Sequence, residues 1–272
     1  MAIGIDSASS LFGQNQLNQA HNRLQTSSER LASGKRINKA ADDAAGLALA
    51  ARLANQLLGT NQAQRNTLDG ISLAQTAEGA LTEVGEITQR MRELAVQSSN
   101  GTLSNEDRSS LQAEFSELQA EASRIFSVTE FNGQPLLNQN TSIDIQVGPE
   151  AGDLISVSTK DLATQLTTDG FFSADISTAQ GAQDALSALN TSLDSVSQNR
   201  ADFGAISNRF ETVIRGLQNN AENVAASQSR IADADYAAET GNRTRDLIQQ
   251  NASLSMTAQA NVTANIAAQL LK

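Results

Sequence analysis

The 272-residue sequence contains no cysteine and no tryptophan, and only one histidine and one tyrosine. Without cysteine the chain has neither a disulfide framework nor a thiolate that could act as a nucleophile or metal ligand. The single His21 cannot build a multi-histidine metal site. Aromatic residues make up only 3% of the chain, which makes an apolar substrate pocket hard to form. We therefore expect no enzyme activity, no catalytic residue, no metal site and no cofactor.

The charge is acidic and unevenly distributed. A net charge of −11 argues against nucleic-acid binding, which requires a concentrated basic surface. Residues 1–45 carry five basic and four acidic residues, and residues 230–272 carry four of each, whereas residues 46–229 hold ten basic and 22 acidic residues. We expect the nearly neutral ends to be the self-associating part of the protein and the acidic middle to be the solvated part.

Two runs near the ends, 7–22 and 247–271, have no charged residue. Gln, Asn, Ser and Thr are spread through both runs, and no stretch of about 18 apolar residues occurs anywhere, so we expect no membrane span. A charge-free amphipathic helix suits packing against other helices better than a free surface. The first residues also lack the basic and apolar regions of a secretory signal peptide, so export would use another route.

The apolar spacing predicts mainly helix, since the only two prolines, Pro135 and Pro149, both lie in the middle. Leu17, Leu24 and Leu31 recur every seven residues and indicate a coiled-coil seam that ends at Ser33-Gly34. Further helices are expected over 44–100 (roughly 55–60 residues), from 104 to about 125 with a weak capping box, over 186–224, and through 270 after a break at 233–235.

The central part has a different pattern. Residues 143–147 and 154–157 alternate with period two on either side of a Gly-Pro turn, which predicts one β-hairpin. The segment 160–178 is expected to be a loop. The predicted fold is mainly α: a long antiparallel helical bundle or coiled coil with one small β-hairpin region, in which the chain folds back so that the termini pair in a coiled coil. We expect an inner terminal-helix domain of residues 1–45 plus 230–272, and an outer domain of residues 46–229 with the hairpin region at 131–160.

Several motifs, in this order along nearly the whole chain, resemble those of bacterial flagellin, the subunit of the flagellar filament. They are Leu31–Gly46, Gln89–Gln97, Phe131–Leu137, Gln146–Gly148, Asn199–Ala205, Glu222–Ser227, Ser229–Asp235 and Leu270–Lys272. The resemblance implies a structural protein that polymerises with itself into a helical filament for swimming motility. It also implies type III export, a secreted protein in the extracellular bacterial flagellum, and contacts with a flagellin export chaperone, the filament cap and hook-junction proteins. Because only 160–178 separates the hairpin from the last third, we expect a short form without further outer domains.

Two sets of site residues follow from these interpretations. The self-assembly residues are Leu17, Leu24, Leu31, Leu247, Leu254, Val262, Ile266 and Leu270. The resemblance also implies a surface recognised by the vertebrate Toll-like receptor for flagellin, with Gln89, Arg90, Glu93, Leu94, Gln97 and Glu114. A plainer explanation for this second set is that Arg90 and Glu93 form ordinary ion pairs while Leu94 packs against its neighbours.

Other functions remain open at this point. A hook–filament junction protein shares the terminal coiled coil but does not propagate, and a coiled-coil binding module would stay monomeric or dimeric. An enzyme with paired carboxylates could use Asp42-Asp43, although we favour a position in the first turn of the long helix, facing its positive end. His21 is expected to be a polar interface residue.

Overall fold

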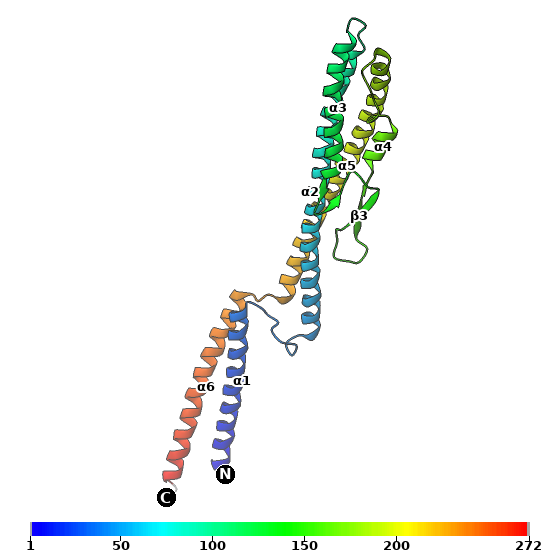
Figure 1. Ribbon diagram of the computed structural model, residues 1–272. Coiled ribbons are helices and arrows are strands. Elements are labelled where there is room, and N and C mark those ends of the chain that lie inside the picture. The colour runs from blue at the N-terminus through cyan, green and yellow to red at the C-terminus, as the bar shows by residue number, and fades with distance from the viewer. Residues whose placement is uncertain (1, 271–272) are drawn as a thin grey trace. The chain divides into compact units, whose positions relative to one another are not determined.

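The computed structural model describes residues 2–270, with side chains described for 11–263 and for Ile266. Within this part the chain forms six helices and four short strands (Figure 1). They are α1 (Ala2–Ser33), α2 (Ala44–Ser98), α3 (Asn105–Val128), β1 (Glu130–Phe131), β2 (Gln134–Pro135), β3 (Thr141–Gln146), β4 (Leu154–Thr159), α4 (Leu162–Thr168), α5 (Ala179–Ala232) and α6 (Tyr236–Leu270). The mainly helical fold is confirmed, and the long helix expected from residue 44 has 55 residues.

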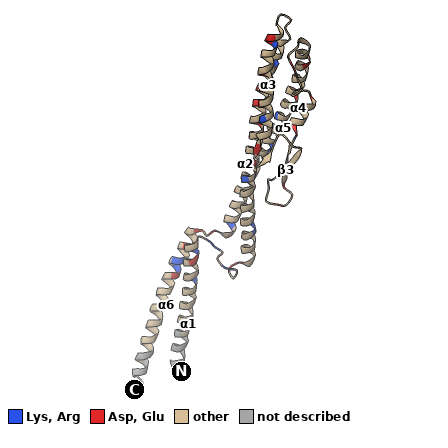
Figure 2. Ribbon diagram, viewed as in Figure 1, with Lys and Arg blue, Asp and Glu red and all other residues tan. Residues whose placement is uncertain are grey.

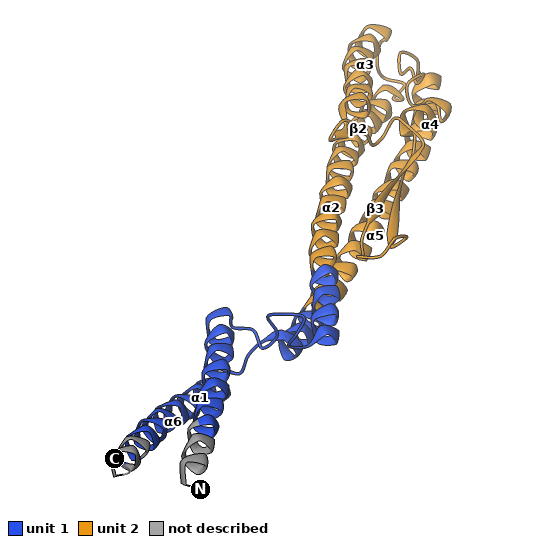
Figure 3. Cartoon of the chain, turned by 90° about the horizontal axis from the view of Figure 1, so that it is seen from below, with its two compact units in different colours: residues 1–57, 222–272 blue, residues 58–221 orange. Residues whose placement is uncertain are grey.

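The chain divides into two compact units, one of residues 1–57 and 222–272 and one of residues 58–221 (Figure 3). Helices α2 and α5 contribute to both units. These boundaries differ from the expected ones at 45 and 230. The loop after α1 explains the shift, because Ile37 is buried against the first turn of α2 at Gly46, which adds the start of α2 to the first unit.

In the first unit, α1 ends at a glycine with left-handed backbone. Gly34 has φ 68°, a conformation that glycine adopts without strain. The chain then pairs with the α5–α6 connection: Arg36 N donates to Ala232 O at 2.7 Å and Ala234 N donates to Gly34 O at 2.9 Å. The two predicted helix breaks, after Ser33 and around 233–235, therefore lie side by side and stabilise each other.

The start of α2 is capped by one of the two adjacent aspartates. Asp43 lies just before the helix, and its Oδ1 accepts a hydrogen bond from Gly46 N at 2.8 Å, so it faces the positive helix end as expected. Asp42 is not in the first turn. Its Oδ2 accepts from the backbone N–H groups of Asn38 and Lys39 at 3.0 Å each, and these bonds lower the Asp42 pKa. The pair is thus structural in this unit.

The second unit has a continuous apolar core between α2, α3 and α5, covered by the strands and α4. Its largest fully buried side chains include Leu81, Met91, Leu94, Phe115, Phe126, Phe171 and Phe210. Helix α3 begins with a complete capping box: Asp107 N donates to Ser104 Oγ at 3.2 Å, and Ser104 N donates to Asp107 Oδ2 at 3.1 Å. The capping motif that looked weak in the sequence therefore forms both of its bonds.

The predicted hairpin is confirmed as β3 and β4, antiparallel from Thr141 opposite Thr159 to Gln146 opposite Leu154. Alternate residues of β4, among them Ile155 and Val157, face the core. A second strand pair, β1 with β2, was expected only as a turn. It closes through Asn132 and Gly133, both with positive φ, as a two-residue hairpin turn requires.

The expectation of a loop over 160–178 was wrong. The segment contains α4, capped by Asp161, whose Oδ1 accepts from Thr164 N at 2.9 Å. Leu162 and Leu166 of this helix are buried. Seven residues give too short a stretch for a periodic pattern to stand out. The start of α5 at 179 was missed for a related reason, because its first buried residues are the small Ala182 and Ala185.

Candidate self-assembly site

Helices α1 and α6 run antiparallel, and small side chains hold the centre of the seam between them. Ala20 and Ser27 of α1 are buried there, at 0% and 5% exposure. At Gly13, a Cβ atom would lie 3.2 Å from Thr257 Cγ2 and 4.0 Å from Thr257 Cβ. The helices therefore approach more closely than a leucine-filled seam allows.

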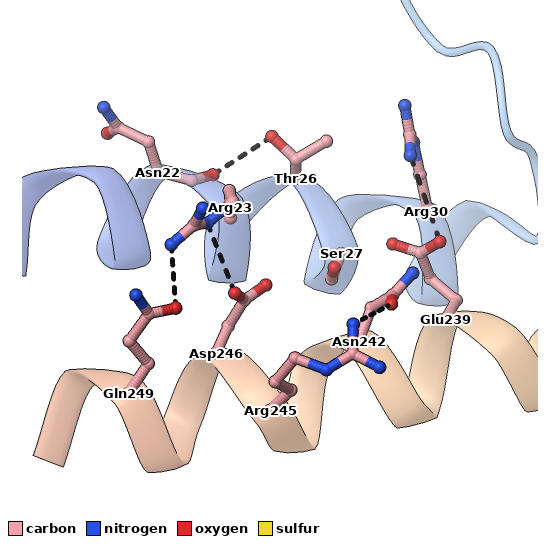
Figure 4. A pocket seen from close by; sticks show the side chains of 10 residues that line it. All are labelled: Asn22, Arg23, Thr26, Ser27, Arg30, Glu239, Asn242, Arg245, Asp246 and Gln249. Carbon is pink, nitrogen blue, oxygen red and sulfur yellow. Dashed lines mark hydrogen bonds and ion pairs between the residues drawn. The ribbon is translucent and has the colours of Figure 1, made fainter. Parts of the chain in front are cut away.

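Two ion pairs cross the seam one heptad apart (Figure 4). Arg23 Nε lies 3.3 Å from Asp246 Oδ1, and Arg30 Nη1 lies 3.9 Å from Glu239 Oε2. Arg23 Nη2 also donates to Gln249 Oε1 at 2.9 Å. Only 10% of the Asp246 side chain and 11% of the Glu239 side chain are exposed. The pairs line a polar groove of about 400 Å³.

The predicted self-assembly residues fall into two groups. Leu17, Leu24 and Leu31 are half-buried beside the seam. The α6 residues instead point to solvent: Leu247, Leu254, Val262 and Ile266 are 38%, 52%, 50% and 52% exposed. The side chain of Leu270 lies outside the described residues. In a single chain, most apolar side chains of α6 are therefore unburied.

Sequence reasoning missed several residues of this site. Ile248 and Met256 of α6, and Leu11 and Phe12 of α1, are between 61% and 70% exposed. Around them, residues 11–22 of α1 and 247–263 of α6 carry no charged residue (Figure 2). The ion pairs were missed as well, although the seven-residue spacing of Arg23 and Arg30 matches that of Glu239 and Asp246 and could have revealed them.

The residues of the second predicted site lie on α2 and α3 of the other unit. Gln89, Arg90, Glu93, Gln97 and Glu114 are exposed. Arg90 Nη2 lies 2.7 Å from Glu114 Oε1, and Arg90 Nη1 lies 3.0 Å from Glu93 Oε2. Hydrogen bonds to Glu114 and then Glu93 raise the Arg90 pKa.

Leu94 does not belong to this exposed set. It is 1% exposed and packs in the core, because it lies on the same face of α2 as the buried Met91. The apolar side chain that α2 exposes nearby is Val96, which is 53% exposed and lines a shallow groove with Gln89, Arg92, Glu93 and Leu193.

Among the residues that the structure describes, no group of three or more His, Cys, Asp or Glu side chains could hold a metal ion. Over the same part of the chain, no helix combines the length and apolar character needed to cross a membrane.

Two protein-family models match most of the chain. Residues 7–142 match the bacterial flagellin N-terminal helical region, and residues 186–271 match the bacterial flagellin C-terminal helical region. The unmatched residues 143–185 contain most of the β3–β4 hairpin, α4 and the first turns of α5.

Similar proteins agree with the family models. The chain is 44% identical to a flagellin of Halalkalibacterium halodurans over 92% of this chain and 93% of that one. It is 36% identical to the flagellar filament 30.7 kDa core protein of Treponema maltophilum, covering 94% and 95% of the two chains. The crystal structure of Bacillus cereus flagellin is similar with a TM-score of 0.51 at 32% identity, covering 60% of this chain and 94% of that one.

Proposed function

This chain belongs to the bacterial flagellin family and is a structural subunit of the flagellar filament, and we propose that α1 and α6 are the part through which subunits polymerise. Flagellins are structural proteins without enzyme activity, they form extracellular filaments, and this subunit polymerises with copies of itself. The hook–filament junction alternative is not favoured, because the relatives are flagellins and filament core proteins.

The exposed apolar side chains of α6 carry this proposal. Leu254, Ile248 and Met256 are 52–70% exposed in the single chain, on a helix end without any charge. Burying such side chains between subunits gains roughly 25 cal/mol per Å² of apolar surface, with no charge to desolvate. Contacts of this kind that repeat without closing produce an open helical polymer.

The same reasoning supports different roles for the two ends and the middle of the chain. We assign the neutral ends, expected at 1–45 and 230–272, to the inner polymerising domain. The segment 46–229, which has an excess of acidic residues and contains the hairpin, forms the outer solvated domain. We propose no further outer domains. Repulsion between acidic outer domains keeps them apart from one another, whereas the neutral ends carry no such penalty.

The substitution Leu254→Glu tests the assignment. In the single chain this side chain is half exposed, so a carboxylate there costs little, but between subunits it would be buried without a partner. Purified protein is heat-dissociated and reassembled in salt, then examined by electron microscopy. We expect L254E to keep its helix content by circular dichroism and to lose long filaments.

Two further variants sharpen this test. Deletion of residues 247–272 is expected to abolish polymerisation and to leave the helix content of residues 58–221 largely intact. Val128→Glu adds the same charge at a position 55% exposed on α3, outside both terminal helices, and is expected to keep polymerising. Normal filaments from L254E or from the deletion variant would refute the assignment.

The proposed route and partners follow from the family. The protein is secreted by type III export, is delivered by a flagellin export chaperone, and contacts the filament cap and hook-junction proteins. The neutral α6 supports this, since a helix that gains its stability from tertiary contacts can remain unfolded until it assembles. Loss of chaperone binding on deletion of 247–272, measured by titration calorimetry, is the expected result.

A host Toll-like receptor is the second proposed partner, through Gln89, Arg90, Glu93, Gln97 and Glu114. The exposure and the charge of these side chains support the proposal, since Arg90 lies between the carboxylates of Glu93 and Glu114 on an accessible face. Arg90→Ala is expected to lower receptor-reporter activation by the monomer. Arg124→Ala, which removes another exposed arginine, paired with Glu121, is the matched control, and equal activity of R90A and R124A would contradict the proposal.

A further inference from the structure

We propose that Arg23 and Arg30 of α1, with Asp246 and Glu239 of α6, form a pairing code that fixes one antiparallel register between the terminal helices. This inference rests on the proposed role of α1 and α6 in polymerisation and adds what makes their pairing specific. It would ensure that every subunit presents the same surface to its neighbours.

The rest of the seam contains little register information. Its centre is built from Gly13, Ala20 and Ser27, and small side chains repeated every seven residues fit equally well after a slip of seven. The runs 7–22 and 247–271 have no charge that could oppose such a slip. A homogeneous filament needs one register, so another feature must select it.

The two buried carboxylates supply that selection. Asp246 and Glu239 have side chains only 10% and 11% exposed, each facing an arginine of α1. A buried charge is tolerated when it is paired and is costly when its partner is removed. Specification of register is the best-attested role of buried polar groups between helices.

A slip of seven residues breaks one pair in either direction. In one direction Arg23 meets Glu239, but Asp246 then faces Gln16 and Arg30 lies beyond the start of α6 at Tyr236. In the other direction Arg30 meets Asp246, but Glu239 lies beyond the end of α1 at Ser33 and Arg23 faces Ser253. Only the observed register pairs both carboxylates.

The signs of the charges also select the partner helix. Both basic groups of the two pairs are on α1 and both acidic groups are on α6, while Arg245 of α6, which also lines the groove, donates to Asn242 of its own helix. Pairing α1 with another α1 would bring arginines together, and pairing α6 with another α6 would bring buried carboxylates together, which is unfavourable in both cases. The code therefore favours α1 with α6 among many crowded copies.

The absence of cysteine in this protein allows the register to be measured by disulfide trapping in the full chain. The pair Gly13→Cys/Thr257→Cys reports the observed register, because a Cβ at 13 would lie 4.0 Å from Thr257 Cβ, within the range of a disulfide. The pairs G13C/Q250C and A20C/T257C report slips of seven residues in the two directions. Non-reducing gels of oxidised filaments give the yield of each crosslink.

Each reporter pair is combined with charge variants. The half swap R23E/R30E places added carboxylates opposite Glu239 and Asp246, and we expect the ratio of observed-register to slipped crosslinks to fall roughly tenfold. The full swap R23E/R30E/D246R/E239R restores complementarity and is expected to restore the ratio. R124E/R215E reverses two charges that are 59% and 65% exposed outside the seam and is expected to leave the ratio unchanged.

If the half swap prevents α1 from pairing with α6 at all, the full swap still tests the proposal, because it should restore both the pairing and the crosslink ratio. A half swap with the original ratio, or a full swap that fails to restore it, would overturn the pairing code. Filament formation, scored by electron microscopy on the same samples, is a separate result: normal filaments with an insensitive crosslink ratio overturn the code alone, whereas filaments from L254E overturn the proposed role of α6.

Discussion

The ring of Phe210 on α5 lies directly against the backbone of Gly70 on α2. A Cβ atom at residue 70 would lie 2.8 Å from Phe210 Cζ and 2.9 Å from Cε2, closer than two carbon atoms can pack. Both residues are buried. The absence of a side chain at residue 70 is thus what allows the largest side chain of this part of α5 into the core.

Gly70→Ala is expected to destabilise the protein in spite of the better helix propensity of alanine. The substitution gains about 1 kcal/mol from propensity but forces the ring aside, which costs roughly 1–3 kcal/mol in a packed core. We expect a net loss of roughly 1 kcal/mol in the free energy of unfolding, measured by urea denaturation.

Gly79→Ala is the matched control on the same helix, since a Cβ at residue 79 would meet nothing within 4 Å. It should gain up to about 1 kcal/mol. Because G70A/F210L removes the ring that the methyl group meets, this double variant should be no less stable than F210L. An increase in stability from G70A comparable to that from G79A would show that the contact imposes no strain.

Phe171→Ala should be among the most destabilising single substitutions in the chain. The side chain is 0% exposed, its ring packs edge-on against Phe172 with centroids 4.9 Å apart, and its carbonyl accepts from Gln119 Nε2 at 2.8 Å. Truncating a buried phenylalanine costs about 3–5 kcal/mol. Urea denaturation monitored by circular dichroism measures the loss.

The control Phe12→Ala removes the same atoms from a side chain that is 67% exposed on α1. It should change the stability of the monomer by less than about 0.5 kcal/mol. Equal effects of F171A and F12A would mean that the segment after α4 does not contribute to the core, contrary to its burial.

The long helices could be predicted from the sequence because their signals are local and repeated. A periodic apolar pattern that ends at Asn100-Gly101 predicted α2, which has 55 residues. The alternation around a Gly-Pro turn predicted β3 and β4. Helix α4 could not be found in this way. Its burial depends on Leu162 and Leu166 meeting a core formed by distant segments, which is a tertiary effect that local patterns do not contain.

The pairing of the two terminal helices was predicted from the sequence, but the packing between them was not. The leucine spacing predicted a seam of leucines, whereas the structure builds the seam from Ala20, Ser27 and two ion pairs whose carboxylates are buried. Which face of α6 meets α1 depends on how two helices distant in sequence align. Leu94 was misplaced for the same reason, since it lies on the face of α2 that packs inward together with Met91.

Asp107→Asn should weaken the start of α3 in a pH-dependent way. Asp107 Oδ2 accepts from Ser104 Oγ at 2.7 Å and from Ser104 N at 3.1 Å, and these bonds lower the Asp107 pKa below its ordinary value. Because the folded-state pKa is lower than the unfolded value of about 3.9, the stabilisation is fully present above that value and is lost as the pH falls through the folded-state pKa. The difference in Tm between the unmodified protein and D107N should therefore be constant from about pH 7 to pH 5 and should shrink at lower pH.

Thermal denaturation of both proteins across this range measures the difference in Tm, and taking the difference removes the titration of all other carboxyl groups. A difference in Tm that stays the same down to about pH 2 would show that the charge of Asp107 does not stabilise the cap.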